Sequence, residues 1–374
     1  MNGGSSCGNS KKEESPDYTM KIPYYPHIIV AAVTAASTVW VHHRQVTFEA
    51  EVKHLETTLL LLPRSSKEEK DAKTSSTTID PLQSYNNLPL CVQEYFQVVF
   101  GRASKSDNND NILQLQHIST SIRSLQMQQT GQFSLNSEEW YPFQAHQIFT
   151  THPPGFVWKM DLSMMPTQPW WWFAGIIRNS YIAKVHVIDA LVPRGGGGGV
   201  LKATLGGFVT LAQMEGQWEA DMGELLRWLA EAALYPTVLL PEENTVTWKA
   251  LDGQDHQALV SFSPDYMKSI ISTARDRKWN ATPEMIVTFD PDTHFIATVE
   301  CQRPRATSDG TAFETGLWMG HFFNYKPTFM KDGTTIWVPT HMECGWVEND
   351  TLKLYFKGDN FDLRYTTTPF RSKE

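Results

Sequence analysis

Two hydrophobic patterns divide the chain. From residue 124 onward, most of the sequence alternates apolar and polar positions with a period of two, which is typical of antiparallel strands with one buried face. Residues 221–235 differ, because Leu225 and Leu229 recur at helical spacing while Glu224 and Arg227 lie on the other side. The pattern predicts one amphipathic helix among many strands.

The ends of this helix carry recognisable signals. Asp221 is suited to cap the N-terminus, with Glu224 at the third helical position, and Pro236 stops the helix after Tyr235. The apolar stripe, which includes Trp228, is expected to lie in the core.

The alternating segments amount to about ten to twelve strands, which is within the usual range for one curved sheet. They are residues 124–135, 140–149, 156–164, 181–188, 200–213, 246–251, 257–262, 285–289, 295–302, 313–323, 335–347 and 352–365. The predicted fold class is mainly β (α+β), a single curved antiparallel sheet or half-barrel packed on one long helix, 221–235. The glycine run at 195–199 is followed by neither the Lys-Ser/Thr nor the helix of a phosphate loop, and is expected to be a flexible insertion.

The N-terminal part has a different composition. Residues 1–23 are rich in Gly, Ser, Lys and Glu and are expected to be disordered. Residues 24–43 contain an uncharged stretch, 28–41, which is marginal for a span of about 20 residues. The composition favours a single-pass membrane anchor helix. A cleaved signal segment, which would leave a secreted or organelle-lumen protein, is the alternative.

A short amphipathic helix and a charged Ser/Thr linker follow over residues 44–84, with Val52, Leu55 and Leu59 on one helical face. The globular domain is expected over residues 85–368. It opens with a short helix at 88–100.

Composition excludes some partners. The net charge of −9 and the absence of a basic cluster argue against nucleic-acid binding. Thirteen Trp and 19 Phe residues could fill a core or line an apolar pocket. The cysteines are too scattered for a zinc site or a disulfide framework, although Cys301 and Cys344 could pair in an oxidising compartment.

We find no catalytic motif, and no cofactor or metal is predicted. A nucleophile elbow is missing, and no histidine pair has the spacing of a helical zinc site. His341 and Glu343 would share one strand face and could bind a metal or exchange a proton. Without a third ligand, a solvated strand face is the favoured interpretation of this pair.

Several strings resemble a family of uncharacterised, mainly bacterial proteins known only as a domain of unknown function. They are QTGQF at 129–133, WYPFQAHQIF at 140–149, PPGFVWKMDLSM at 153–164, GELLRWLAEAALYPTVLLP at 223–241, VTWKALD at 246–252 and IWVPT at 336–340. The resemblance covers about residues 88–366 in the same order. Asn179 replaces an acidic residue of the family pattern. The resemblance implies one domain, often membrane-linked, whose sheet looks like the half-barrels of lipoprotein carriers; it implies no activity.

Three functional hypotheses remain. The leading one is a membrane-anchored protein that binds a lipid or other apolar ligand between sheet and helix, in a cavity lined by Phe143, Phe156, Trp158, Met160, Trp228 and Leu229. The second is an enzyme acting on a lipid-like or small polar substrate, with a polar site of Arg178, Tyr181, Glu224, Arg227 and His341. The third is a structural or assembly protein at a membrane.

Overall fold

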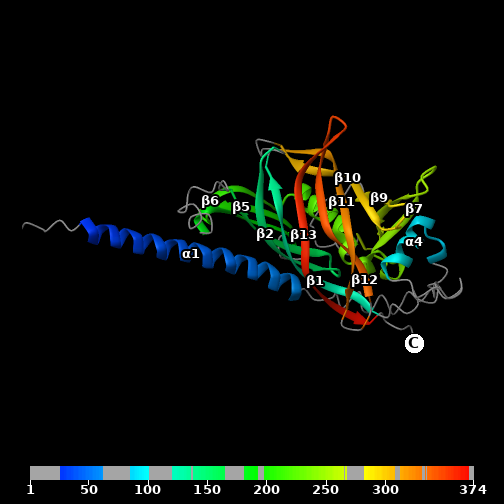
Figure 1. The fold of residues 1–374 in the computed structure, drawn as a ribbon, viewed down its shortest axis with the longest axis horizontal. Helices are drawn as coiled ribbons and strands as arrows, with labels where there is room; N and C mark the ends of the chain where they lie inside the picture. Colours follow the sequence, from blue (N-terminus) through cyan, green and yellow to red (C-terminus); the bar gives the residue numbers. More distant parts are fainter. Residues whose placement is uncertain are drawn as a thin grey trace, which may run out of the picture.

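The computed structural model describes residues 26–61, 85–100, 120–135, 138–164, 181–192, 198–264, 266–267, 282–307, 312–330, 333 and 335–369. Within them the chain forms one open, curved sheet of 13 strands, in which every neighbouring pair is antiparallel (Figure 1). The strands are β1 (Thr120–Ser134), β2 (Trp140–Thr150), β3 (Gly155–Ser163), β4 (Lys184–Val192), β5 (Gly198–Leu205), β6 (Val209–Glu215), β7 (Val246–Ala250), β8 (Gln257–Phe262), β9 (Glu284–Phe289), β10 (Ile296–Ala306), β11 (Phe313–Phe329), β12 (Thr335–Glu348) and β13 (Thr351–Pro369). The predicted mainly β class and single antiparallel sheet are confirmed.

The strand order divides the sheet into two wings. It runs β6-β5-β4-β3-β2-β1-β13-β12-β11-β10-β9-β8-β7, so the first and last strands pair in the middle. Each wing is a meander, and the chain passes from one edge strand, β6, to the other, β7, through the long helical segment. That segment contacts β3, β4 and β5 of one wing and β9 and β10 of the other. It therefore ties the two wings together across the inner face of the sheet.

The central helix is displaced from its predicted limits. Helix α7 (Trp218–Ala230) begins three residues before Asp221, with extended Gln217 as the N-cap. Asp221 does not cap the helix; its Oδ1 accepts the backbone N–H of Gly199 at 2.7 Å. This contact explains why Gly198 and Gly199 of the predicted flexible insertion instead open strand β5.

Beyond Ala230 the chain tightens into three short 3-10 turns, η2 (Glu231–Leu234), η3 (Pro236–Leu239) and η4 (Pro241–Glu243). Pro236 cannot continue an α-helix, because its ring occupies the position of the missing N–H. The predicted core positions Leu225, Trp228 and Leu229 are buried, as expected. The indole of Trp228 donates to the carbonyl of Thr150 at 2.8 Å, which fixes the helix to the end of β2.

A second helix covers the opposite face of the same wing. Helix α1 (Pro26–Leu61) is continuous through 36 residues, so the predicted anchor segment and the short helix after it are one element. Its Phe48, Val52, Leu55 and Leu59 form a separate apolar cluster with outward residues of three strands. These are Val157, Ile188, Ala190, Val192 and Val200.

The structure adds little about the membrane. In the part of the chain that it describes, no helix is both long and apolar enough to cross a bilayer. Residues 1–25 and the linker at 62–84 lie outside the described residues, as does the aromatic stretch at 166–173. The membrane anchor and its signal-segment alternative stay predictions.

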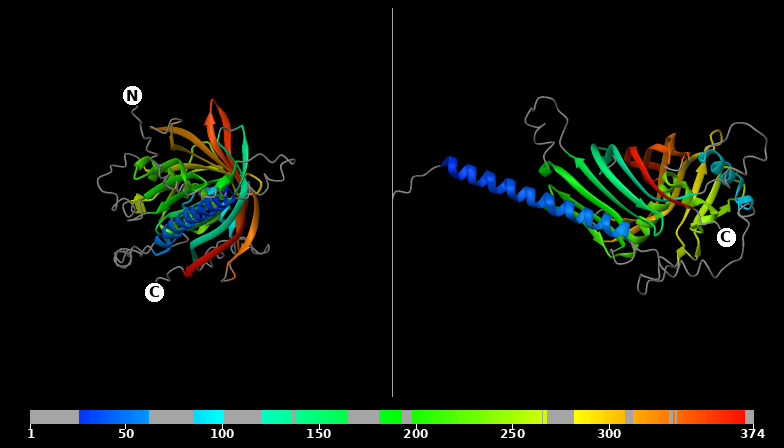
Figure 2. Two further views of the ribbon diagram at one scale, coloured as in Figure 1. Left: turned by 90° about the vertical axis from the view of Figure 1, so that its left-hand side faces the viewer. Right: turned by 90° about the horizontal axis from the view of Figure 1, so that it is seen from below.

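The inner and outer faces can be told apart residue by residue. On β3, Phe156 and Trp158 belong to the main core under α7, whereas Val157 between them belongs to the cluster under α1. Figure 2 shows α1 running across one side of the sheet and projecting past it. A third helix, α4 (Leu90–Val99), close to its predicted limits, packs against the β7–β13 wing.

Candidate functional site

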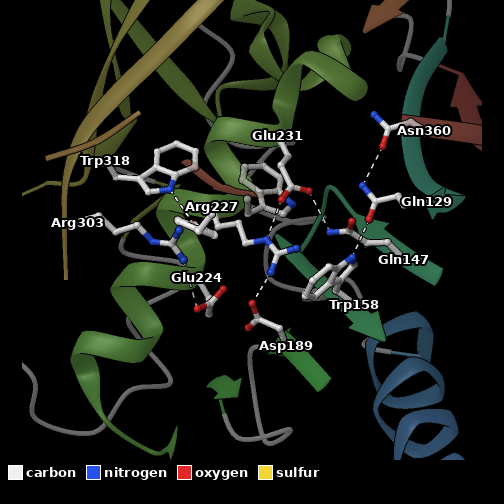
Figure 3. A network of polar contacts seen from close by, with 12 residues as sticks. Gln129, Gln147, Trp158, Asp189, Glu224, Arg227, Glu231, Arg303, Trp318 and Asn360 are labelled. Carbon is white, nitrogen blue, oxygen red and sulfur yellow. Dashed lines mark hydrogen bonds and ion pairs between the residues drawn. The ribbon is translucent and has the colours of Figure 1, made fainter. Parts of the chain in front are cut away.

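A network of charged side chains lies inside the molecule, between α7 and the inner face of the sheet (Figure 3). Arg227 of α7 stands at its centre. The Nε atom of Arg227 donates to Glu231 Oε1 at 2.7 Å, and its Nη1 atom donates to Asp189 of β4. The guanidinium also lies over two aromatic rings, 4.7 Å from the ring centre of Phe156 and 4.8 Å from that of Trp158. The arginine is thus fixed by two carboxylates and two cation–π contacts.

The same helix face reaches the other wing. Arg303 of β10 contacts Glu224 Oε1 of α7 at 3.4 Å. Its guanidinium also lies 5.6 Å from the ring centre of Trp318, whose indole donates to the hydroxyl of Tyr355 at 2.9 Å. Because Asp189 and Arg303 belong to different wings, α7 connects the two wings through charge as well as apolar packing.

Glu224 holds a proton at neutral pH. Burial, with the nearby Asp189 carboxylate as the second cause, raises the pKa of Glu224 to about 8, even though Arg303 and Arg227 act in the opposite direction. Glu224 Oε2 and Asp189 Oδ1 have no hydrogen-bond partner among the described residues. The two carboxyl groups repel each other when both are ionised, which favours the protonated form of Glu224.

Two more polar atoms of the network have no partner in the described structure. Gln147 of β2 donates through Nε2 to Glu231 Oε2 at 3.0 Å, but its Oε1 atom is unpaired. The Nε atom of Arg303 is unpaired as well. Gln147 is 0% exposed and Arg303 is 8% exposed. A buried polar atom without a partner costs about 1–3 kcal/mol of stability.

A fully paired amide chain extends the network towards the middle of the sheet. Trp158 Nε1 donates to Gln129 Oε1 at 2.7 Å, and Gln129 Nε2 donates to Asn360 Oδ1 at 2.8 Å. Figure 3 shows these side chains following one another from β3 to β13. The unpaired atoms are therefore confined to the part of the network beside α7.

Comparison with known proteins assigns the domain to a family. A model of a family of unknown function, DUF6920, matches residues 86–365, well over half of the chain. The chain belongs to DUF6920. The resemblance predicted from the sequence strings, over about residues 88–366, is confirmed. No curated protein matches the chain. Among solved structures, a LolA superfamily protein from Nitrosomonas europaea is similar at 8% identity, with a TM-score of 0.29 over 66% of this chain and 88% of that chain.

Solvent reaches the DUF6920 network at its charged groups. Each of these side chains keeps 10–14% of its surface exposed: Asp189, Glu224, Arg227, Glu231 and Arg303. The six residues predicted to line an apolar cavity are buried in the main core, at 0–4% exposed: Phe143, Phe156, Trp158, Met160, Trp228 and Leu229. The open surface at this place is polar, and the apolar residues surround it.

The predicted polar residues of the DUF6920 domain fall in three places. Glu224 and Arg227 meet in the network. Tyr181 lies on the outer face, with its ring stacked 3.8 Å from that of His186, which in turn faces Phe48 of α1. His341 lies on the outer side of β12, where Nδ1 is 2.7 Å from Asp359 Oδ1. The fifth predicted residue, Arg178, is outside the described residues.

Two other predictions concern cysteines and metals. Cys91, Cys301 and Cys344 are all free, and β11 separates the strands that carry Cys301 and Cys344. Burial raises the pKa of the Cys344 thiol to about 11 and that of Cys301 to about 12, so neither is a ready nucleophile. Among the residues described, no three His, Cys, Asp or Glu side chains gather as metal ligands.

Sequence reasoning missed most partners of Arg227. Asp189 and Arg303 are charged residues at inward positions of otherwise apolar strands, following Val185 and Val187 in one case and Val299 and Cys301 in the other. A charge on the apolar face of a strand is a signal that the sequence contains. It marks a buried charged group, although it does not say which partner it meets.

Proposed function

We propose that the DUF6920 domain binds a lipid or another molecule with an apolar part, between α7 and the inner face of the sheet. The observation that carries the proposal is the pair of buried, unpartnered atoms, Gln147 Oε1 and Arg303 Nε, inside a shell of aromatic residues. Such atoms lower stability unless something completes their hydrogen bonds. A bound molecule with a polar end would do so.

The charge of the network limits the polar end of the ligand. Two arginines face three carboxyl groups, so the total is −1 when every carboxyl is ionised and zero when Glu224 is protonated. The network therefore has no excess positive charge that would attract an anionic group. Gln147 Oε1 accepts a hydrogen bond and Arg303 Nε donates one, and hydroxyl or amide groups provide both complements.

The apolar end would be held by the aromatic and aliphatic side chains around the network. Among these are Phe156 and Trp158, whose rings contact Arg227, and Leu229 of α7. Because these side chains are almost completely buried, an apolar chain can enter only if α7 moves relative to one wing. The links that must open are the ion pairs of Arg227 with Asp189 and of Arg303 with Glu224. Ligand binding and the integrity of the network are therefore coupled.

The test is native mass spectrometry of the full chain, purified without detergent and measured again after incubation with a mixed lipid extract. Gln147→Met removes the unpaired acceptor, and Gln144→Met, on the outer side of the same strand, is the matched control. We expect one bound apolar molecule on the wild type and on the control, and a large loss on Gln147→Met. An apo mass for all three proteins after lipid incubation would contradict the proposal.

A second candidate function is supported by the buried carboxyl of Glu224, whose pKa is raised to about 8 next to Asp189. A protonated carboxyl beside a carboxylate can act as acid and base, and the two arginines can stabilise negative charge that develops on a substrate. This would make the domain an enzyme acting on a lipid-like or small polar substrate. Glu224→Gln should then bind the extracted molecule but leave its mass unchanged, whereas the wild type should convert it. An unchanged molecule on both proteins would exclude this activity for that molecule.

A further inference from the structure

Exposed apolar side chains gather where α1 passes the turn between β5 and β6. They belong to α1, to the turn and to β6, and their exposed fractions are 68% for Val39, 44% for Trp40, 38% for Phe208, 46% for Val209 and 53% for Leu211. We call these five residues the hairpin-end patch. Scattered single apolar residues on a surface are ordinary, but a group of this kind marks an interaction surface.

The geometry holds the two parts of the patch together. The ring centres of Trp40 and Phe208 are 5.2 Å apart. Phe208 is presented by a tight turn, because Gly206 and Gly207 have φ of 59° and 76° and the N–H of Phe208 donates to Leu205 O at 3.1 Å. A residue with a side chain at either glycine would be strained. The turn thus directs Phe208 towards α1.

The edge strand beside this turn is unprotected. β6 reads VTLAQME, so that it carries no charge before Glu215 and no proline. Natural sheets usually guard exposed edges with charges or prolines, because an apolar edge invites association. The lack of such charges and prolines in the first part of β6 indicates that another phase or molecule covers the end of β6 that follows Phe208.

Two observations favour a lipid bilayer as the covering phase. The sequence of α1 has no charged residue from 28 to 41, and this helix projects past the sheet (Figures 1 and 2). One turn later, the guanidinium of Arg44 lies 5.7 Å from the ring centre of Trp40. An indole with a cation at the end of an apolar segment is the arrangement found where helices meet lipid headgroups.

We infer that the hairpin-end patch rests on the surface of a phospholipid bilayer, with α1 entering the interface and β6 beside it. This inference does not depend on the ligand proposed for the inner site. The net charge of −9 argues against a requirement for anionic lipids. The bilayer chemistry that fits is zwitterionic headgroups over an apolar boundary.

The test is flotation of the full chain with phosphatidylcholine vesicles. Phe208→Ser with Leu211→Ser removes the sheet part of the patch and leaves the uncharged stretch of α1 intact. The matched control is Phe329→Ser with Leu90→Ser, two residues that are 76% and 68% exposed and lie outside the patch. We expect the patch variant to lower the vesicle-bound fraction about tenfold and the control to stay within about twofold of the wild type.

Unfolding midpoints of the variants confirm that each protein is folded, and Trp40→Ala provides an independent change on the helix side of the patch. Loss of vesicle binding with Trp40→Ala as well as with the hairpin variant supports the inference. A wild type that does not float overturns it, because the protein then does not bind the bilayer. A patch variant that floats as well as the wild type also overturns it, because α1 alone then accounts for the binding.

Discussion

The two helices that sandwich the β3–β5 wing use opposite means of attachment. On the outer face, α1 packs an apolar stripe against the sheet and surrounds it with ion pairs. Lys159 contacts Glu49 there, and Lys202 contacts Glu51, with the two glutamate side chains 45% and 37% exposed. On the inner face, the charged side chains of α7 are buried, and Glu224 Oε2 has no hydrogen-bond partner among the residues that the structure describes.

The difference distinguishes an ordinary helix attachment from a charged network whose burial costs stability. Exposed ion pairs contribute about 0–1 kcal/mol each. The pairs on the outer face therefore need no role other than the attachment of α1. Buried charges lose several kcal/mol of hydration, which their mutual attraction offsets only with good geometry. An interface built for stability alone would be apolar. The burial of these charges therefore costs stability, and this cost supports the ligand site proposed for the inner network.

The sharpest way to break this comparison is Arg227→Met, set against Lys159→Met on the outer face. Removing Arg227 leaves Asp189 and Glu231 buried without the cation that both contact, and we expect a loss of about 3–5 kcal/mol in the free energy of unfolding. Lys159→Met should cost less than about 1 kcal/mol. Both values come from denaturant titration with the full chain. Equal losses would mean that the inner network contributes no more to the free energy of unfolding than the outer ion pairs do.

The pH dependence of stability tests the proton of Glu224. Its pKa is raised from the ordinary value of 4.5 to about 8 in the folded domain, so the folded state binds this proton more tightly than the unfolded state. The resulting stability is fully present below about pH 4.5 and is lost as the pH rises through about 8. Glu224→Gln imitates the protonated form and should lack this loss.

The measurement is the difference in unfolding free energy between wild type and Glu224→Gln, followed from pH 5 to 9 by urea titration. Between the two pKa values the wild type should lose up to about 1.4 kcal/mol per pH unit relative to the variant, or a few kcal/mol in total. Parallel profiles for the two proteins would show that Glu224 holds no such proton.

The outer face allows a prediction of intermediate size. Leu59 is 1% exposed under α1, so Leu59→Ala should weaken the attachment of α1 by about 2–3 kcal/mol, while the unfolding midpoint of the rest of the domain changes little. Hydrogen exchange of the α1 amides measures the attachment. Leu60→Ala, at a position that is 47% exposed, is the control and should leave exchange unchanged. Cooperative loss of the whole domain with Leu59→Ala would make α1 part of the core.

The fold was largely readable from the sequence, for reasons that particular elements make clear. A period of two identifies a strand and its buried face but not its neighbour, so the pairing of β1 with β13 in the middle of the sheet was not predictable. The start of α7 was misplaced because Gln217 is an unremarkable cap, whereas Asp221 imitates a good one while bonding to Gly199. The continuity of α1 follows from the absence of any glycine or proline between residues 27 and 61.

The site was only half readable. Glu224 and Arg227 were named because they share a helix face, and Phe156 and Trp158 because they alternate along one strand. Their charged partners come from strands remote in sequence, so only the folded sheet brings them together. The inward charge of Asp189 was the available signal, because Val185, Val187 and Leu191 flank it on the same buried face. Tyr181 was assigned to the site although an intact sheet separates it from Arg227.

The smallest expected effect concerns an ion pair between α1 and the outer face of the sheet. Glu51→Gln removes the carboxylate that accepts two hydrogen bonds from Lys202 Nζ, at 2.8 and 2.6 Å, but this glutamate side chain is 37% exposed. We expect α1 attachment to weaken by about 0.5 kcal/mol in low salt and by almost nothing in about 1 M NaCl, where the Debye length is about 3 Å. Hydrogen exchange of α1 at the two salt concentrations measures both values. A salt-independent loss of several kcal/mol would place a buried charge on the outer face as well, and the inner network would then no longer be the distinctive feature of the domain.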